Sequence, residues 1–244
     1  MLLFYIILSL IATSIGSVLL SSILLFLNDK WLQRISSYLL YLAGGTLLGS
    51  ALLGLLPQAA QNLSITTIGV WLLVGIMFFF LLEKILLWRS CADQNCPRKT
   101  HTAAPMIIVG DAFHNAIDGV VITGSFLISP ELGGFVTLSV LLHEIPQEMG
   151  DFGILLRSGY SRRKALIYNL LSGVAALLAG IAAYFALTFF QNVIPYVIVV
   201  AAAGFLYIAL ADLIPEMHRE SNNRKSLVQI LLILAGIFII VFSL

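Results

Sequence analysis

The sequence predicts an all-α integral membrane protein that crosses the bilayer eight times. Of its 244 residues, 60% are hydrophobic and only 10% are charged, and its mean hydropathy is +1.02. A soluble domain carries about 25% charged residues, so a soluble fold of this size is excluded and membrane lipid is the expected surroundings. The formal net charge of +1 provides no basic surface for nucleic acid.

Eight apolar runs reach the roughly 20 residues that cross a hydrocarbon core of about 30 Å. The breaks between them are too short to fold alone, so we expect a single transmembrane domain over residues 1–244. The first run lacks a basic leader and is longer than a signal-peptide core of about 7 to 15 residues, which favours a genuine helix. The expected spans are 2–27, 36–56, 65–88, 105–128, 134–156, 164–190, 196–214 and 227–242.

The basic residues predict the orientation. All 13 lysines and arginines lie in or beside the breaks after expected spans one, three, five and seven, and neither terminus carries one. Loops rich in lysine and arginine stay in the cytoplasm. We therefore expect a multi-pass protein of the cell (inner) membrane with both termini outside the cytoplasm.

A short internal similarity indicates inverted repeats. Residues 51–58 and 209–216 match at four positions, including a proline, although four matches in an apolar alphabet can arise by chance. The expected topology runs these two segments in opposite directions, as in transporters whose halves are inverted copies around central helices.

The fourth and fifth expected spans carry five acidic residues at membrane depth and no lysine or arginine. Each acid costs about 2.5 to 3.5 kcal/mol at a helix centre, or about 12 to 17 kcal/mol together, if nothing compensates its charge. A bound cation or bound protons must therefore offset it. The residues are Asp111, Asp118, Glu144, Glu148 and Asp151.

Histidines accompany these acids at the same depth. His114 and Asp118 share one helical stripe at i,i+4 spacing, and His143 and Gln147 share another. Pro146 frees a backbone carbonyl beside them, which a membrane tolerates only where protein, ion or water satisfies it. Neutral imidazole with carboxylate suits borderline divalent metals.

Three segments carry a family resemblance. The run 110–119, GDAFHNAIDG, resembles the fourth-helix signature of ZIP (Zrt/Irt-like) metal transporters, and 143–152, HEIPQEMGDF, resembles the fifth-helix signature of their LIV-1 subfamily. Residues 209–217, ALADLIPEM, resemble the seventh-helix segment. With the eight spans and outside termini, the resemblance covers essentially the whole chain.

The resemblance implies a homodimeric carrier that moves zinc, iron, manganese or related divalent ions into the cytoplasm as transported substrate, with no prosthetic group. It implies a 3+2+3 helix arrangement and an elevator in which helices 1, 4, 5 and 6 move against the others. By position, the family's main metal site falls on His114, Asp118 and His143 with Gln147 in fourth place, and the adjacent second site on Asn115, Glu144 and Glu148.

The sequence departs from the family pattern in three places. Gln147 replaces the usual His or Glu, which predicts weaker binding or a preference for harder ions. Asn169 stands in the region where some bacterial relatives place a carboxylate, which argues against a binuclear centre. Gly54 and Gln58 stand where relatives often carry His and Glu, so the outer entrance should be less polar.

Other polar residues have two interpretations each. Asp111 and Asp151 can bind the ion, or can orient its ligands and line the pathway. Asp212 and Glu216, with His218 beyond them, can form an exit station or a solvated helix end. Cys91, Cys96 and His101 make an incomplete zinc site, which favours ordinary loop residues over the alternative of a weak cytoplasmic receiving site.

Two functions compete with metal import. An intramembrane metalloprotease requires His-Glu-x-x-His, but Gln147 occupies the position of the second histidine and Pro146 distorts the turn, so we do not expect an enzyme. A proton-coupled carrier or a channel for another cation is the alternative, because intramembrane carboxylates also form proton relays.

Overall fold

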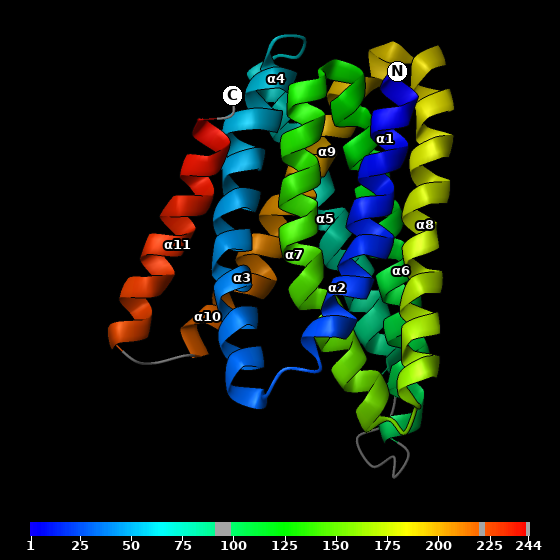
Figure 1. Cartoon of the computed structure of the whole chain (residues 1–244). Helices are drawn as coiled ribbons and strands as arrows, with labels where there is room; N and C mark the ends of the chain where they lie inside the picture. The colour runs from blue at the N-terminus through cyan, green and yellow to red at the C-terminus, as the bar shows by residue number, and fades with distance from the viewer. Residues whose placement is uncertain (91–98, 220–222, 243–244) are drawn as a thin grey trace.

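A computed structural model describes residues 1–90, 99–219 and 223–242 of the chain, and over these residues every regular element is helical (Figure 1). The predicted all-α class is confirmed. The elements are α1 (Leu2–Ile11), η1 (Ala12–Gly16), α2 (Ser17–Leu24), α3 (Asp29–Gly49), η2 (Ser50–Leu55), α4 (Leu56–Ala60), α5 (Ile65–Ser90), α6 (Lys99–Ile128), α7 (Pro130–Arg157), α8 (Arg162–Phe189), η3 (Gln191–Val193), α9 (Ile194–Tyr207), η4 (Ile208–Leu213), α10 (Ile214–Arg219) and α11 (Asn223–Val241).

Five helical stretches in the described part of the chain are long and apolar enough to cross a membrane, which identifies an integral membrane protein. The apolar part of α11, Ser226–Val241, is shorter. The long helices α6 and α7 are not among the five, and they carry the acidic residues at membrane depth. The five stretches are Leu2–Leu24, Arg34–Ala60, Ile65–Ile85, Arg162–Phe189 and Gln191–Ala211.

Side-chain caps set two helix starts that the hydropathy pattern placed later. Asn28 accepts a hydrogen bond from the Trp31 amide at 3.1 Å, so α3 begins at Asp29. Ser129 accepts one from the Leu132 amide at 3.1 Å, and α7 begins at Pro130. Ser129 alone therefore separates α6 from α7. Hydropathy marks the apolar core, whereas a capped helix extends beyond it into the polar edge.

The internal similarity has a structural counterpart in two π-helical segments. η2 (Ser50–Leu55) and η4 (Ile208–Leu213) lie at the same offset as the matched residues, and each ends two residues before a proline. Proline lacks the amide hydrogen of a regular helix and crowds the carbonyl four residues earlier, so the preceding turn widens. η2 and α4 contact α9, whereas α3 contacts η4 and α10, so the two segments run antiparallel.

Glycines allow the closest helix contacts. A Cβ on Gly119 of α6 would lie 2.2 Å from the Ala176 carbonyl oxygen of α8, and a Cβ on Gly45 of α3 would lie 2.1 Å from the Ile233 carbonyl oxygen of α11. Backbones can approach this closely only where no side chain intervenes. The Gly119 contact holds α6 against α8, and the Gly45 contact holds α3 against α11. α7 packs against α2 and α3.

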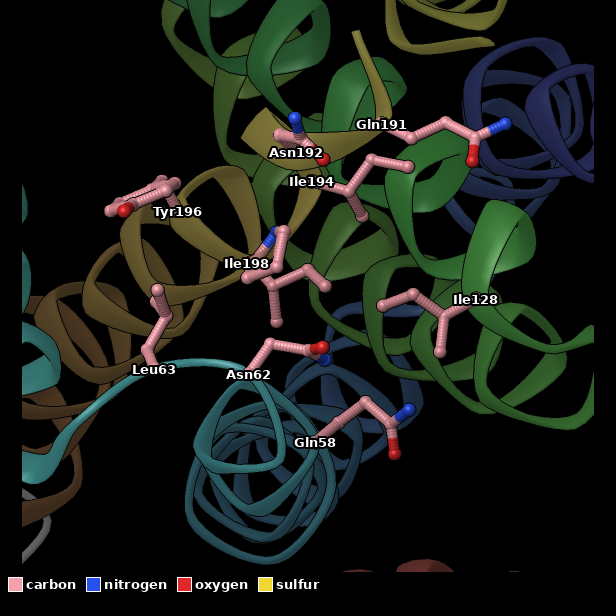
Figure 2. Close-up of a pocket in the computed structure, with 10 residues that line it drawn as sticks. Gln58, Asn62, Leu63, Ile128, Gln191, Asn192, Ile194, Tyr196 and Ile198 are labelled. Atoms are coloured by element: carbon pink, nitrogen blue, oxygen red, sulfur yellow. The ribbon is translucent and has the colours of Figure 1, made fainter.

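The two ends of the bundle differ. Both termini lie at one end, and α3 begins, α7 ends and α8 begins at the other (Figure 1). At the terminal end, a cavity of about 440 Å³ lies between the end of α4, the end of α6 and the start of α9 (Figure 2). Its polar lining consists of neutral carboxamides and a tyrosine, namely Gln58, Asn62, Gln191, Asn192 and Tyr196.

Candidate metal site

Two imidazoles and two carboxylates meet between α6 and α7. The Nε2 atoms of His114 and His143 lie 3.2 Å apart, and Asp118 Oδ2 lies 3.2 Å from His143 Nε2 and 3.7 Å from His114 Nε2. Glu144 Oε1 lies 3.5 Å from His114 Nε2 and 3.9 Å from His143 Nε2. One ligand atom from each of the four residues therefore lies within 4.8 Å of the others, close enough for a single ion to contact all four. We call these four residues the imidazole cluster.

The imidazole cluster is buried and oriented. The side chains of Asp118, His143 and Glu144 are at most 5% exposed, whereas that of His114 is 23% exposed. His143 Nδ1 lies 3.0 Å from the Ser139 carbonyl oxygen, one turn earlier in α7. This backbone contact favours the tautomer that leaves Nε2 free to bind an ion, the usual arrangement of metal-binding histidines.

A second group shares one member with the first. Ligand atoms of Asp111, Glu144 and Glu148 lie within 4.8 Å of one another, and we call these residues the carboxylate cluster. Asp111 already accepts hydrogen bonds from Asn115 Nδ2 at 3.0 Å, from Gln147 Nε2 at 3.2 Å and from the Ser172 hydroxyl. The clusters meet at Glu144.

Several carboxylate oxygens have no hydrogen-bond partner among the described residues. Both oxygens of Glu144 and both of Glu148 are buried and make no hydrogen bond to a described residue. An isolated ionised carboxylate is very costly in a low-dielectric interior unless a cation or a proton compensates it. This donor set of imidazole nitrogen and carboxylate oxygen matches borderline divalent metals.

The structure places the remaining predicted site residues as follows. Asn115 and Gln147 both contact Asp111. Asp151 lies on α7 outside both clusters, partly buried, and Asn169 is buried in α8. His218 is exposed in α10. The side chains of Asp212, Glu216 and His101, and all of Cys91 and Cys96, lie outside the described residues.

Some partners of the site carry no sequence signal. The Ser139 carbonyl belongs to the backbone, and Ser172 reaches Asp111 from α8, 61 residues away in the chain. α7 continues through Pro146, and Ser21 of α2 donates a hydrogen bond to the neighbouring Ile145 carbonyl at 2.9 Å. Glu83 of α5 lines a cavity together with His114, and the sequence could have indicated it, because it is the sole acidic residue in that apolar helix.

Comparison with known proteins identifies the family. A family profile described as ZIP zinc transporter matches residues 2–100 and 90–244. Zinc transporter ZIP13 of Pongo abelii is 34% identical over 84% of this chain and 66% of its own length. The Danio rerio ZIP13 protein is 30% identical over 84% of this chain and 74% of its own length, and zinc transporter foi of Drosophila melanogaster is 41% identical over 57% and 19%.

The chain belongs to the ZIP zinc transporter family. The family expected from the helix signatures is confirmed, and it is a family of transporters and not of enzymes. The chain spans just under two thirds of the length of the Pongo abelii relative.

Proposed function

We propose that this protein transports divalent transition-metal ions, with zinc as the first substrate to test, through the clusters between α6 and α7. The buried imidazole cluster carries the proposal, because two histidines and two acids converge at a depth where their burial needs a cation. The names of the relatives agree with zinc. Iron and manganese are the other candidate substrates.

Unequal access to the imidazole cluster supports a carrier. On one side, His114 lines a cavity of about 180 Å³ between α5, α6 and α9. On the other side, the carboxamide-lined cavity reaches Ile128, about 21 Å along α6 from His114 at 1.5 Å per residue. Buried apolar residues, among them Ile122, Val136 and Val140, occupy the space between. An ion crossing this layer requires a rearrangement of the helices.

The packing supports eight spans in a 3+2+3 arrangement. In such an inverted repeat, spans one to three correspond to spans six to eight, and span four corresponds to span five. Thus α3 corresponds to α9 and α5 to α11. The contact of α3 with α11 then corresponds to that of α9 with α5, and both pairs pack extensively. Likewise, the contact of α6 with α8 corresponds to that of α7 with α1, η1 and α2. These groups match the two bodies of an elevator.

Orientation and assembly complete the proposal. The helix ends that carry the basic residues lie opposite the termini (Figure 1), which supports a cytoplasmic basic end and extracytoplasmic termini in a cell membrane. The proposed transport direction is into the cytoplasm. We also propose a homodimer, on the strength of the family resemblance.

Zinc uptake by proteoliposomes tests the function. Wild-type protein in vesicles loaded with a zinc-sensitive dye should give saturable uptake. His114→Ala should lower the rate by at least about 100-fold, since it removes a direct ligand and even residues behind metal ligands typically contribute 10- to 100-fold. Glu131→Gln, an exposed acid at the start of α7, is the matched control. Unchanged uptake in His114→Ala, or an ohmic current, would contradict a carrier using this site.

A further inference from the structure

An acid of α5 faces the imidazole cluster across the smaller cavity. Glu83 and His114 both line the space of about 180 Å³, together with Phe79, Gly110 and Tyr207. Among the described residues that line it, Glu83 is the only carboxylate. A metal ion that leaves His114 on this side therefore meets Glu83.

Within the part of the chain that the structure describes, Glu83 has no basic partner that would explain its place in an apolar helix. No described lysine or arginine forms an ion pair with it, and the ammonium of the neighbouring Lys84 lies over the Phe80 ring, 5.9 Å from its centroid. An acidic residue at membrane depth without a cationic partner indicates a functional site. Lys84 and Arg89 follow it in α5, so Glu83 lies between His114 and the basic end of that helix.

Tyr207 holds this carboxylate. Its hydroxyl donates a hydrogen bond to Glu83 Oε2, and its ring stacks on Phe79 with the centroids 6.3 Å apart. Tyr207 ends α9 and is followed directly by the π-helical segment η4, whose first residue, Ile208, also lines the cavity. π-helical turns are frequent at functional sites. A rearrangement of η4 would move the hydroxyl and free the carboxylate oxygen.

From this arrangement we infer that Glu83 is a release ligand, which binds the divalent ion as it leaves the imidazole cluster towards the basic end, with Tyr207 holding the carboxylate until then. The inference rests on the proposed transport function. The competing explanation is a structural one, in which the hydrogen bond merely ties α5 to α9. These two helices already pack closely where Gly75 meets Ala203.

Two substitutions separate the explanations in the zinc-uptake assay with the full chain. Glu83→Gln keeps an acceptor for the Tyr207 hydroxyl but removes the negative charge, whereas Tyr207→Phe keeps the charge but removes the hydrogen bond. A release ligand predicts that Glu83→Gln lowers the maximal uptake rate by about tenfold, that Glu83→Asp restores part of it, and that Tyr207→Phe loses less. A structural tie predicts the reverse order, which would overturn the inference.

Zinc binding to the purified protein provides a second readout. Equilibrium dialysis of Glu83→Gln with zinc alone should retain the wild-type affinity, because the imidazole cluster is intact. Lost binding would overturn the inference, since Glu83 would then act on the resting site or on folding. If the wild type takes up zinc and Glu83→Gln does so at the same rate, the inference is also refuted. If the wild type takes up no zinc, the transport function itself is refuted. Glu131→Gln again serves as the control.

Discussion

The imidazole and carboxylate clusters lie side by side but differ in how their charge is satisfied. In the imidazole cluster, Asp118 and Glu144 face two imidazoles, and both oxygens of Glu144 lack a hydrogen-bond partner among the described residues. In the carboxylate cluster, Asp111 already accepts hydrogen bonds from Asn115, Gln147 and Ser172. Neutral donors thus satisfy Asp111, whereas both oxygens of Glu148 in the same cluster lack a partner among the described residues, as those of Glu144 do. The imidazole cluster differs in offering its acids two ring nitrogens instead of neutral amide and hydroxyl donors.

This difference indicates a division of labour. Two imidazole nitrogens make the imidazole cluster the stronger site for zinc and similar ions, while an all-oxygen set suits harder ions and binds zinc less selectively. The carboxylate cluster therefore contributes charge and a transient place for the ion. Glu144 belongs to both clusters, so the comparison ranks three substitutions.

Glu144→Gln should have the largest effect. It removes an anionic ligand from both clusters while keeping the size of the side chain, so zinc affinity should fall by at least about 100-fold, or about 2.8 kcal/mol. Isothermal titration of the purified variant with zinc measures the change. Because the Glu144 oxygens make no hydrogen bond to another described residue, the thermal stability without metal should not fall. A variant with wild-type affinity would remove Glu144 from the site.

Asp111→Asn should have an intermediate effect. It removes charge from the carboxylate cluster only, so zinc affinity should fall by about tenfold, or about 1.4 kcal/mol. Glu131→Gln, an exposed acid at the start of α7 that belongs to neither cluster, is the control. An effect of Asp111→Asn as large as that of Glu144→Gln, seen in the same titration, would show that the two clusters do not differ in the way proposed.

Gln147→His should have the smallest effect and change selectivity. An added imidazole favours zinc and cadmium over manganese, and we expect the preference to shift by about fivefold, or about 1 kcal/mol. Uptake competition among zinc, iron, manganese and cadmium measures it. An unchanged order of preference would mean that Gln147 serves only to hold Asp111, through its 3.2 Å hydrogen bond.

The sequence singled out the candidate site residues, but it did not predict how they group in space. Helical spacing placed His114 with Asp118, and the membrane cost of the acids marked Glu144 and Glu148 as functional. The family resemblance put Gln147 in fourth place beside the histidines, whereas in the structure its amide nitrogen contacts Asp111 and Glu144 lies beside the imidazoles. Spacing along one helix does not determine its rotation against a neighbour, which depends on packing across the interface.

The sequence by itself determined the membrane environment, the helical class, the family and the helices that carry the candidate ligands, because hydropathy, charge placement and local motifs act over short stretches of chain. Only the tertiary structure decided which ligands meet, that Ser172 reaches Asp111 from another helix, and that Glu83 shares a cavity with His114. Those contacts join residues far apart in the chain, and the close approach of helices at glycines such as Gly119 sets them.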